Sequence, residues 1–270
     1  MTSNSSTDPL SPTTLRVERS GPNDAVARVT LNRPDVRNAF NDTVIGELTA
    51  VFEALGQDPS LRAIVLAAEG KAFCAGADLN WMKAMAGYSW DENHADAGRL
   101  AHMLWTLYSC PVPVIARVQG IATAAGCQLV AMCDLAVASR DAKFAVSGVN
   151  LGLFCSTPSV ALSRNLSRKA AFEMLVTGAF IDADEARVKG LVNRVADPDR
   201  LDAEVEALVA SIVAKPRVAI AMGKALFYRQ LEAGIEAAYA DAGQTMACNM
   251  MDASALEGVQ AFIEKRPPRN

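Results

Sequence analysis

Short apolar runs alternate with longer helix-like segments through most of the chain, and this alternation limits the possible fold more than any other feature. The runs are rich in Val and Ile and are bounded by turn residues, as in the buried strands of a parallel sheet. Helical spacing covers residues 42–55, 92–107 and 168–177, and Gly178 follows the last segment in the position that ends a helix. The sequence therefore predicts an α/β fold. The predicted strands are residues 25–31, 63–68, 113–120, 134–139 and 191–195.

The two ends of the chain differ from this alternating region. Residues 1–14 are rich in Ser, Thr and Pro and predict a disordered tail before a core over residues 15–200. Beyond that core the strands stop and apolar residues recur at helical spacing, which predicts a helical C-terminal layer over residues 201–270. Its methionines favour an adaptable packing surface or a subunit interface, with burial inside the chain as the alternative. The residues behind these two statements are Leu201, Val205, Leu208, Ile212, Met246, Met250 and Met251.

Charge and composition exclude several classes of protein. The formal charge is −4 over 270 residues with Lys and Arg scattered, so no nucleic-acid site and no polybasic membrane surface are expected. No apolar run is long enough to insert into a membrane. The six cysteines include no CxxC pair, which favours buried thiols in a reducing compartment over a metal site or disulfides. The first dozen residues contain no Arg, so we expect a cytoplasmic protein without a transit peptide.

Two strand-to-helix turns contain unusually small residues. In "EGKAFCAGADLNWM", residues 69–82, Gly70 ends a strand and Asp78 opens a helical stretch. In "GIATAAGCQLVAMCDLAVAS", residues 120–139, the turn leads into a helix that contains a single Gln128. Small residues let a ligand approach the backbone, and free amides at a helix N-terminus favour negative charge. Two such turns can form an oxyanion hole, although close helix–strand packing alone would also select small residues.

Four segments together resemble the crotonase superfamily, also called the enoyl-CoA hydratase/isomerase superfamily. They are "NRPDVRNAFN", "KAFCAGADLNWM", "VQGIATAAGCQLVAMCDLAVAS" and "ALEGVQAFIEKRPP", and the resemblance runs from about residue 15 to residue 268. It implies a crotonase-like spiral of ββα units with a C-terminal helical trimerisation region. It also implies a homotrimer, or a hexamer built as a dimer of trimers, that binds an acyl-CoA thioester. Coenzyme A is then part of the substrate, and no other cofactor or metal is implied.

The resemblance also assigns roles to individual residues. The oxyanion hole maps onto the amides of Ala77 and Ala125, and Arg37 maps near the CoA phosphates. Lys265 corresponds to a lysine that reaches CoA bound to a neighbouring subunit, although a solvated charge is the commoner role of a lysine. Asp78 has helix capping as its alternative role. The implied substrate-binding set is Arg37, Ala75, Ala77, Asp78, Leu79, Asn80, Ala125 and Lys265.

Both glutamates of the superfamily's hydratases are replaced in this chain. Gln128 lies three residues after Ala125 and so shares its helix face, where hydratases have one glutamate. Gly148 occupies the position of the other. Gln can orient a water molecule but cannot take its proton, and glycine can do neither. The weaker catalytic candidates are Ser156, at a position where other members have a carboxylate, and His102. His102 lies in or beside the predicted helix 92–107, and in one branch of the family a histidine near this helix lines the pocket.

Three functions remain open from the sequence. The first is a divergent enoyl-CoA hydratase/isomerase family enzyme that stabilises an enolate or tetrahedral intermediate in the hole. The second is an acyl-CoA thioesterase or decarboxylase, in which polarisation of the carbonyl matters more than paired carboxylates. The third is a non-catalytic acyl-CoA-binding protein that kept the fold after losing the acid–base pair.

Overall fold

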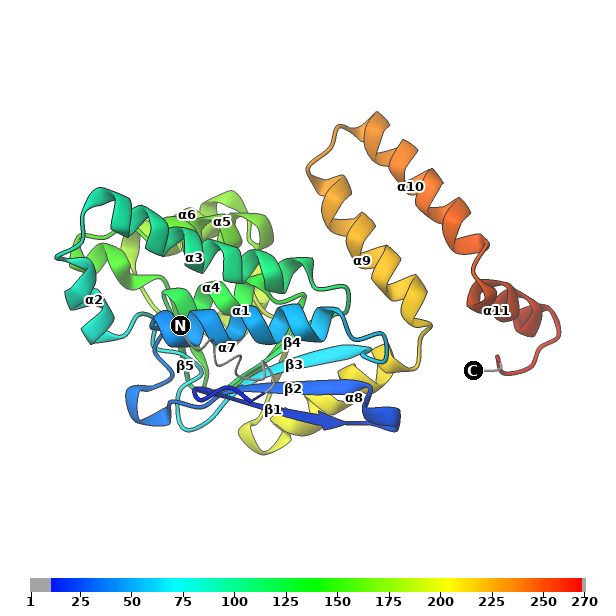
Figure 1. The fold of residues 1–270 in the computed structure, drawn as a ribbon, viewed down its shortest axis with the longest axis horizontal. Coiled ribbons are helices and arrows are strands. Elements are labelled where there is room, and N and C mark those ends of the chain that lie inside the picture. The colour runs from blue at the N-terminus through cyan, green and yellow to red at the C-terminus, as the bar shows by residue number, and fades with distance from the viewer. Residues whose placement is uncertain (1–10, 269–270) are drawn as a thin grey trace, which may run out of the picture.

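The computed structural model describes residues 11–268 and contains two sheets surrounded by helices (Figure 1). The larger sheet has the order β1-β2-β3-β4-β6-β9, and the smaller has the order β5-β7-β8. The strands are β1 Leu15–Ser20, β2 Val26–Leu31, β3 Ala63–Ala68, β4 Val114–Val118, β5 Ile121–Thr123, β6 Leu135–Ser139, β7 Lys143–Ala145, β8 Ile181–Asp182 and β9 Arg194–Ala196. The α-helices are α1 Asp42–Gly56, α2 Leu79–Met85, α3 Trp90–Ser109, α4 Ala125–Met132, α5 Ser156–Asn165, α6 Arg168–Thr177, α7 Ala183–Lys189, α8 Leu201–Val213, α9 Arg217–Leu231, α10 Ile235–Met250 and α11 Ala253–Ile263.

The central strands are buried on both faces of the larger sheet. From β2 to β9 the neighbouring strands are parallel, and β1 adds an antiparallel edge. Along β3 the side chains alternate between two cores, so that Ile64 and Leu66 face one and Val65 faces the other. Both faces of this strand need apolar residues, which explains the uninterrupted run from residue 63 to residue 68.

Helices cover the two faces of this sheet unequally. The first core lies under α1, α3 and α4, whereas α8 covers the opposite face through Val205 and Leu208 (Figure 1). α1 begins at Asn41, whose side chain accepts a hydrogen bond from the Val44 amide at 3.0 Å. This arrangement fixes the segments that follow β3 and β4 at one edge of the sheet.

The last three helices form an extension, which we call the arm, that stands away from the rest of the molecule (Figure 1). α9 contains no buried residue, α10 buries only Ala238, and α11 buries only Ala261. Large apolar side chains on the arm are highly exposed, including Met251 at 81% and Phe262 at 85%. The arm therefore presents an apolar surface that its own chain does not cover.

The structure adds detail at both ends of the chain. Residues 1–10 of the predicted disordered tail lie outside the described residues, but Thr13 and Thr14 are held by hydrogen bonds to the Glu47 carboxylate at 2.5–2.8 Å. At the other end α8 packs on the sheet, so only residues 217–263 form the separate helical part. Within residues 11–268 no helix has both the length and the apolar character needed to cross a membrane.

Candidate active site

The segments that follow β3 and β4 run side by side. Cys74 forms a parallel bridge with Ala122, and the Thr123 amide donates to the Cys74 carbonyl at 3.0 Å. On its other side the first segment is bridged to the loop before α1 through Ala77 and Phe40. Two turns that are far apart in the sequence are therefore held against each other.

Gly76 and Gly126 make this close approach possible. A Cβ atom on Gly76, where φ is 92°, would lie 3.0 Å from the Cβ of Ala124. A Cβ atom on Gly126 would lie 2.4 Å from the carbonyl oxygen of Cys74, closer than real Cβ contacts allow. The small residues thus serve close packing, and that same packing brings the two turns together.

Two backbone amides at these turns have no acceptor. Within residues 11–268 neither the Ala77 nor the Ala125 amide donates a hydrogen bond, although the next amide, of Asp78, donates to the Phe40 carbonyl at 2.8 Å. Ala125 is the first residue of α4, so its N–H points out of the helix end where the dipole favours negative charge. Amides placed in this way can stabilise the oxyanion of a polarised carbonyl.

Ala124 has a strained backbone between the two turns. Its φ of 49° and ψ of −115° are rarely adopted by a residue with a Cβ atom, and its amide is held by the Ala145 carbonyl at 2.9 Å. Strain of this kind costs about 1–3 kcal/mol and concentrates at functional sites. The conformation is the one that starts α4 directly beside the first turn.

Gln128 is buried on the first turn of α4, with 3% of its surface exposed. Its Oε1 accepts a hydrogen bond of 3.2 Å from the hydroxyl of Thr157, in the first turn of α5. Thr157 was not identified from the sequence, because nothing in the local pattern shows that α5 packs against α4. The structure therefore joins Gln128 to a partner that fixes its amide.

Gly148 has no room for a side chain. It lies in the short 3₁₀ helix Ser147–Leu151, and a Cβ atom there would be 2.5 Å from the Leu153 carbonyl oxygen and 2.8 Å from Cys155 Sγ. The Gly148 amide also donates to that sulfur at 3.3 Å. A side chain at this position, which the resemblance assigns to a second carboxylate, would thus collide with the chain itself.

Asp78 caps helix α2 from a buried position. Its carboxylate accepts the Asn80 amide at 2.9 Å and lies 3.0 Å from Arg33 Nη2. The hydrogen bond from the Asn80 amide, followed by the contact with Arg33, holds the pKa of Asp78 below its usual value against the opposing effect of burial. These contacts place Asp78 as the cap of the helix that follows Ala77.

The structure gathers most of the residues assigned to CoA binding along one strip. The Arg37 carbonyl accepts a hydrogen bond from the Ala75 amide at 3.0 Å, and the Arg37 side chain is exposed. Leu79 and Asn80 are also exposed at the start of α2. Lys265 is different, because it follows α11 at the outer end of the arm, on the opposite side of the molecule from α2 (Figure 1).

The two weaker catalytic candidates have polar partners outside the two turns. Ser156 is exposed and donates to the Phe154 carbonyl at 3.2 Å, within its own loop. His102 is on the exposed side of α3, 3.6 Å from Glu53 of α1. Neither side chain forms a hydrogen bond or ion pair with Gln128 in the described part of the chain, so a catalytic role for either stays a prediction.

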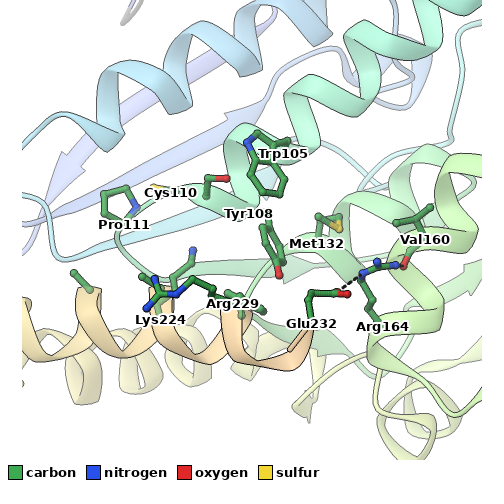
Figure 2. A pocket seen from close by; sticks show the side chains of 14 residues that line it. Trp105, Tyr108, Cys110, Pro111, Met132, Val160, Arg164, Lys224, Arg229 and Glu232 are labelled. Atoms are coloured by element: carbon green, nitrogen blue, oxygen red, sulfur yellow. Dashed lines mark hydrogen bonds and ion pairs between the residues drawn. The ribbon is translucent and has the colours of Figure 1, made fainter. Parts of the chain in front are cut away.

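A cavity of about 670 Å³ lies at the other end of α4 (Figure 2). Trp105 and Tyr108 of α3, Met132 of α4 and Tyr228 of α9 contribute to its walls, and none of the residues assigned from the sequence lines it. At its polar side Asp134 accepts the Tyr228 hydroxyl and lies 2.7 Å from the Lys224 ammonium. Its position between the arm and the rest of the chain separates it from the Ala125 amide at the N-terminus of α4.

Comparison with known proteins places this chain and its fold in one family. The family model described as enoyl-CoA hydratase/isomerase matches residues 21–270, and the chain belongs to that family. Enoyl-CoA hydratase domain-containing protein 3, mitochondrial, from Xenopus laevis is 42% identical over 90% of this chain and 82% of the relative. This relative confirms a narrower resemblance that residues 148–162, "GVNLGLFCSTPSVAL", already suggest.

Solved structures agree with the family assignment. An enoyl-CoA hydratase from Mycobacterium smegmatis is 61% identical, with a TM-score of 0.92, over 95% of this chain and 98% of the other. Human enoyl-CoA hydratase domain-containing protein 3 is 37% identical, with a TM-score of 0.90, over 96% of this chain and all of the other. The expected crotonase fold is therefore confirmed.

The expected cytoplasmic location is contradicted by these relatives. The proteins from Xenopus laevis, Rattus norvegicus and Homo sapiens that resemble this chain are all named mitochondrial. The expectation rested on the composition of the first dozen residues, and ten of these lie outside the described residues.

Proposed function

We propose that this protein binds an acyl-CoA thioester and polarises its carbonyl with the amides of Ala77 and Ala125. The observation that carries the proposal is the contact between two turns that each end in an amide without an acceptor. Two such donors lower the barrier of a step that places negative charge on the thioester oxygen, at roughly 3–4 kcal/mol per donor. An enolate and a tetrahedral intermediate both carry that charge.

Ordinary hydration of an enoyl thioester is not part of this proposal. Hydration needs one group that takes a proton from water and another that delivers a proton to carbon. Gln128 cannot do the first, and Gly148 has no space for a carboxylate that would do the second. We therefore propose a reaction that passes through an enolate or a tetrahedral intermediate bound in the oxyanion hole. Thioester hydrolysis and decarboxylation are such reactions, and neither needs paired carboxylates.

The proposal includes a homotrimer, alone or paired into a hexamer. A monomer with the exposed apolar arm would carry an unusually large uncovered surface. If the arm packs on a second copy of the chain, Lys265 at its end reaches that neighbour's CoA, in line with the resemblance that assigns it there. This accounts for the distance between Lys265 and the amides of its own chain.

The test is spectroscopic binding of cinnamoyl-CoA, whose conjugated thioester absorbs at longer wavelength when its carbonyl oxygen accepts hydrogen bonds. We expect a red shift with the native protein. Ala125→Pro removes one donor at the first helical position, where proline is tolerated, so it should abolish most of the shift and weaken binding about tenfold. Ala124→Gly keeps the amide and is the matched control. A full red shift in Ala125→Pro would refute the role of this amide.

A further inference from the structure

The hydroxyl of Thr157 fixes which way the Gln128 amide faces. Because Thr157 Oγ1 donates to Gln128 Oε1 at 3.2 Å, the amide nitrogen is turned to the opposite side. Within residues 11–268, Gln128 Nε2 donates to no group, and it is not one of the fully buried unpartnered atoms, so it keeps access to solvent. The side chain thus presents two free N–H donors.

Helix geometry directs these donors toward the proposed oxyanion hole. A helical side chain leans toward the N-terminus of its own helix, and the N-terminus of α4 carries the Ala125 amide. Residues three apart on a helix lie ~5–6 Å from each other, close enough for one short acyl group to reach both the Ala125 amide and the Gln128 side chain. A ligand whose carbonyl is held by Ala125 therefore brings its C3 next to Gln128.

The segments around these donors carry almost no charge. Residues 118–133 and 144–163 contain no Asp, Glu, Lys, Arg or His, and residues 72–82 contain only Asp78. The Asp78 carboxylate is already engaged by Arg33 and the Asn80 amide. A carboxylate on the acyl group would have no cation to pair with, whereas a neutral oxygen would find the Gln128 donor.

We propose that Gln128, oriented by Thr157, is a specificity residue that donates a hydrogen bond to a neutral oxygen on C3 of the acyl group. The preferred substrate class is then 3-oxoacyl- and 3-hydroxyacyl-CoA thioesters, in place of 2-enoyl thioesters. A 2-enoyl or saturated chain leaves the donor unpaired, and sites built to bond a substrate oxygen discriminate against analogues that lack it. This inference rests on the proposed acyl-CoA binding at Ala77 and Ala125.

The test is calorimetric binding of butyryl-, crotonyl-, 3-hydroxybutyryl-, acetoacetyl- and malonyl-CoA to the full chain. We expect the two thioesters with a neutral C3 oxygen to bind at least tenfold more tightly than butyryl- and crotonyl-CoA, and malonyl-CoA to gain no such advantage. Gln128→Leu and Thr157→Val should remove this preference, while Thr157→Ser should keep it. Ser159→Ala is the matched control, because that hydroxyl bonds the Ser156 carbonyl within α5.

Each other outcome contradicts a separate part of the inference. Equal binding of all five thioesters overturns the assigned substrate class and leaves the proposed function intact. A preference that survives both Gln128→Leu and Thr157→Val overturns the role of these residues. Tighter binding of malonyl-CoA than of acetoacetyl-CoA overturns the neutral-oxygen argument. Absence of binding for every thioester rejects the proposed function and this inference with it.

Discussion

At the scale of single residues, Gly148 shows that the position assigned by the resemblance to a second glutamate has no space for a side chain. The Leu153 carbonyl and the Cys155 sulfur occupy the space in which a Cβ would lie. From the sequence alone, one would expect that adding glutamates at positions 128 and 148 converts the protein to a hydratase. The structure argues against it, because the second glutamate would have to displace backbone. We expect that Gln128→Glu with Gly148→Glu gives a destabilised protein without crotonyl-CoA hydration.

The packing at Gly148 can be measured with a smaller change. Gly148→Ala should lower the free energy of unfolding by about 1–3 kcal/mol, as overpacking does. Gly98→Ala is the matched control, since a Cβ on Gly98 in the middle of α3 meets no atom within 4 Å. That control should raise stability by up to ~1 kcal/mol. Chemical denaturation measures the free energy of unfolding of both variants. An unchanged value for Gly148→Ala would show that residues 148–155 can shift to accommodate the added methyl group.

Two buried aspartates should have opposite effects on the pH dependence of stability. Burial is the main cause that raises the pKa of Asp96, whose carboxylate faces Arg99 at 2.5 Å and also lies near Asp42 and Trp81. The ionised form of Asp96 is therefore disfavoured by folding. The loss of folding stability caused by ionised Asp96 is absent at pH values below the unperturbed pKa of 3.8, and it grows as the pH rises through the raised pKa of the folded protein. Asp78 has a lowered pKa, so its stabilisation is present above 3.8 and is lost as pH falls.

The measurement is denaturant unfolding of Asp96→Asn and Asp78→Asn at several pH values between 3 and 7. As pH rises, the native protein should lose stability relative to Asp96→Asn and gain stability relative to Asp78→Asn. Asn is as good an N-cap as Asp, so the second variant removes charge while keeping the α2 cap. Slopes of the same sign for both variants would contradict the assignment.

At the scale of elements, the start of α4 contains both the Ala125 amide of the proposed oxyanion hole and the strained backbone of Ala124. In Ala124→Gly the Cβ that opposes a φ of 49° is removed, and this relief offsets the entropy cost of glycine. We expect the free energy of unfolding to stay equal or rise. Ala50→Gly, in the middle of α1 where the backbone is ordinary, should instead cost about 1 kcal/mol. A comparable loss in both variants would show that Ala124 is not strained.

Elements with a strong local signal were predicted from the sequence, and elements defined by distant partners were not. The helix predicted over residues 168–177 is α6, because Ser167 caps its start and Gly178 takes the left-handed conformation at its end. The strand predicted over residues 113–120 is β4, whereas β5, which begins at Ile121 just beyond it and belongs to the other sheet, was not predicted. Such a change of sheet depends on pairing with β7, which no local pattern reveals.

The same distinction holds for the candidate site. The small residues that mark the two turns are visible in the sequence, and so is the loss of both carboxylates. The partner of Gln128 is not, because Thr157 lies 29 residues away and reaches it only through the packing of α5 on α4. Likewise, only the tertiary contacts show that Gly148 is filled by its own loop.

At the scale of the whole molecule, the exposed apolar surface of the arm predicts that several copies of the chain assemble into an oligomer. Phe262→Asp puts a charge on a side chain that is 85% exposed in one chain and that we place in an intersubunit contact. We expect the native protein to have three or six times the 28.6 kDa mass of one chain, and the variant to be smaller. Glu236→Ala, on an exposed position of α10, is the control that should not change the mass. Light scattering after size exclusion measures both, and a native monomer would refute the assembly.

The most direct test of the whole account follows crotonyl-CoA on one sample of native protein, with loss of the conjugated absorbance, release of free thiol and binding recorded in parallel. We predict that the thioester binds and that hydration stays well below ~1 s⁻¹, because the two-amide site lacks both proton-transfer groups. Hydration at ~1 s⁻¹ or faster would contradict the central claim, since it would require an acid–base pair that neither Gln128 nor Gly148 can provide.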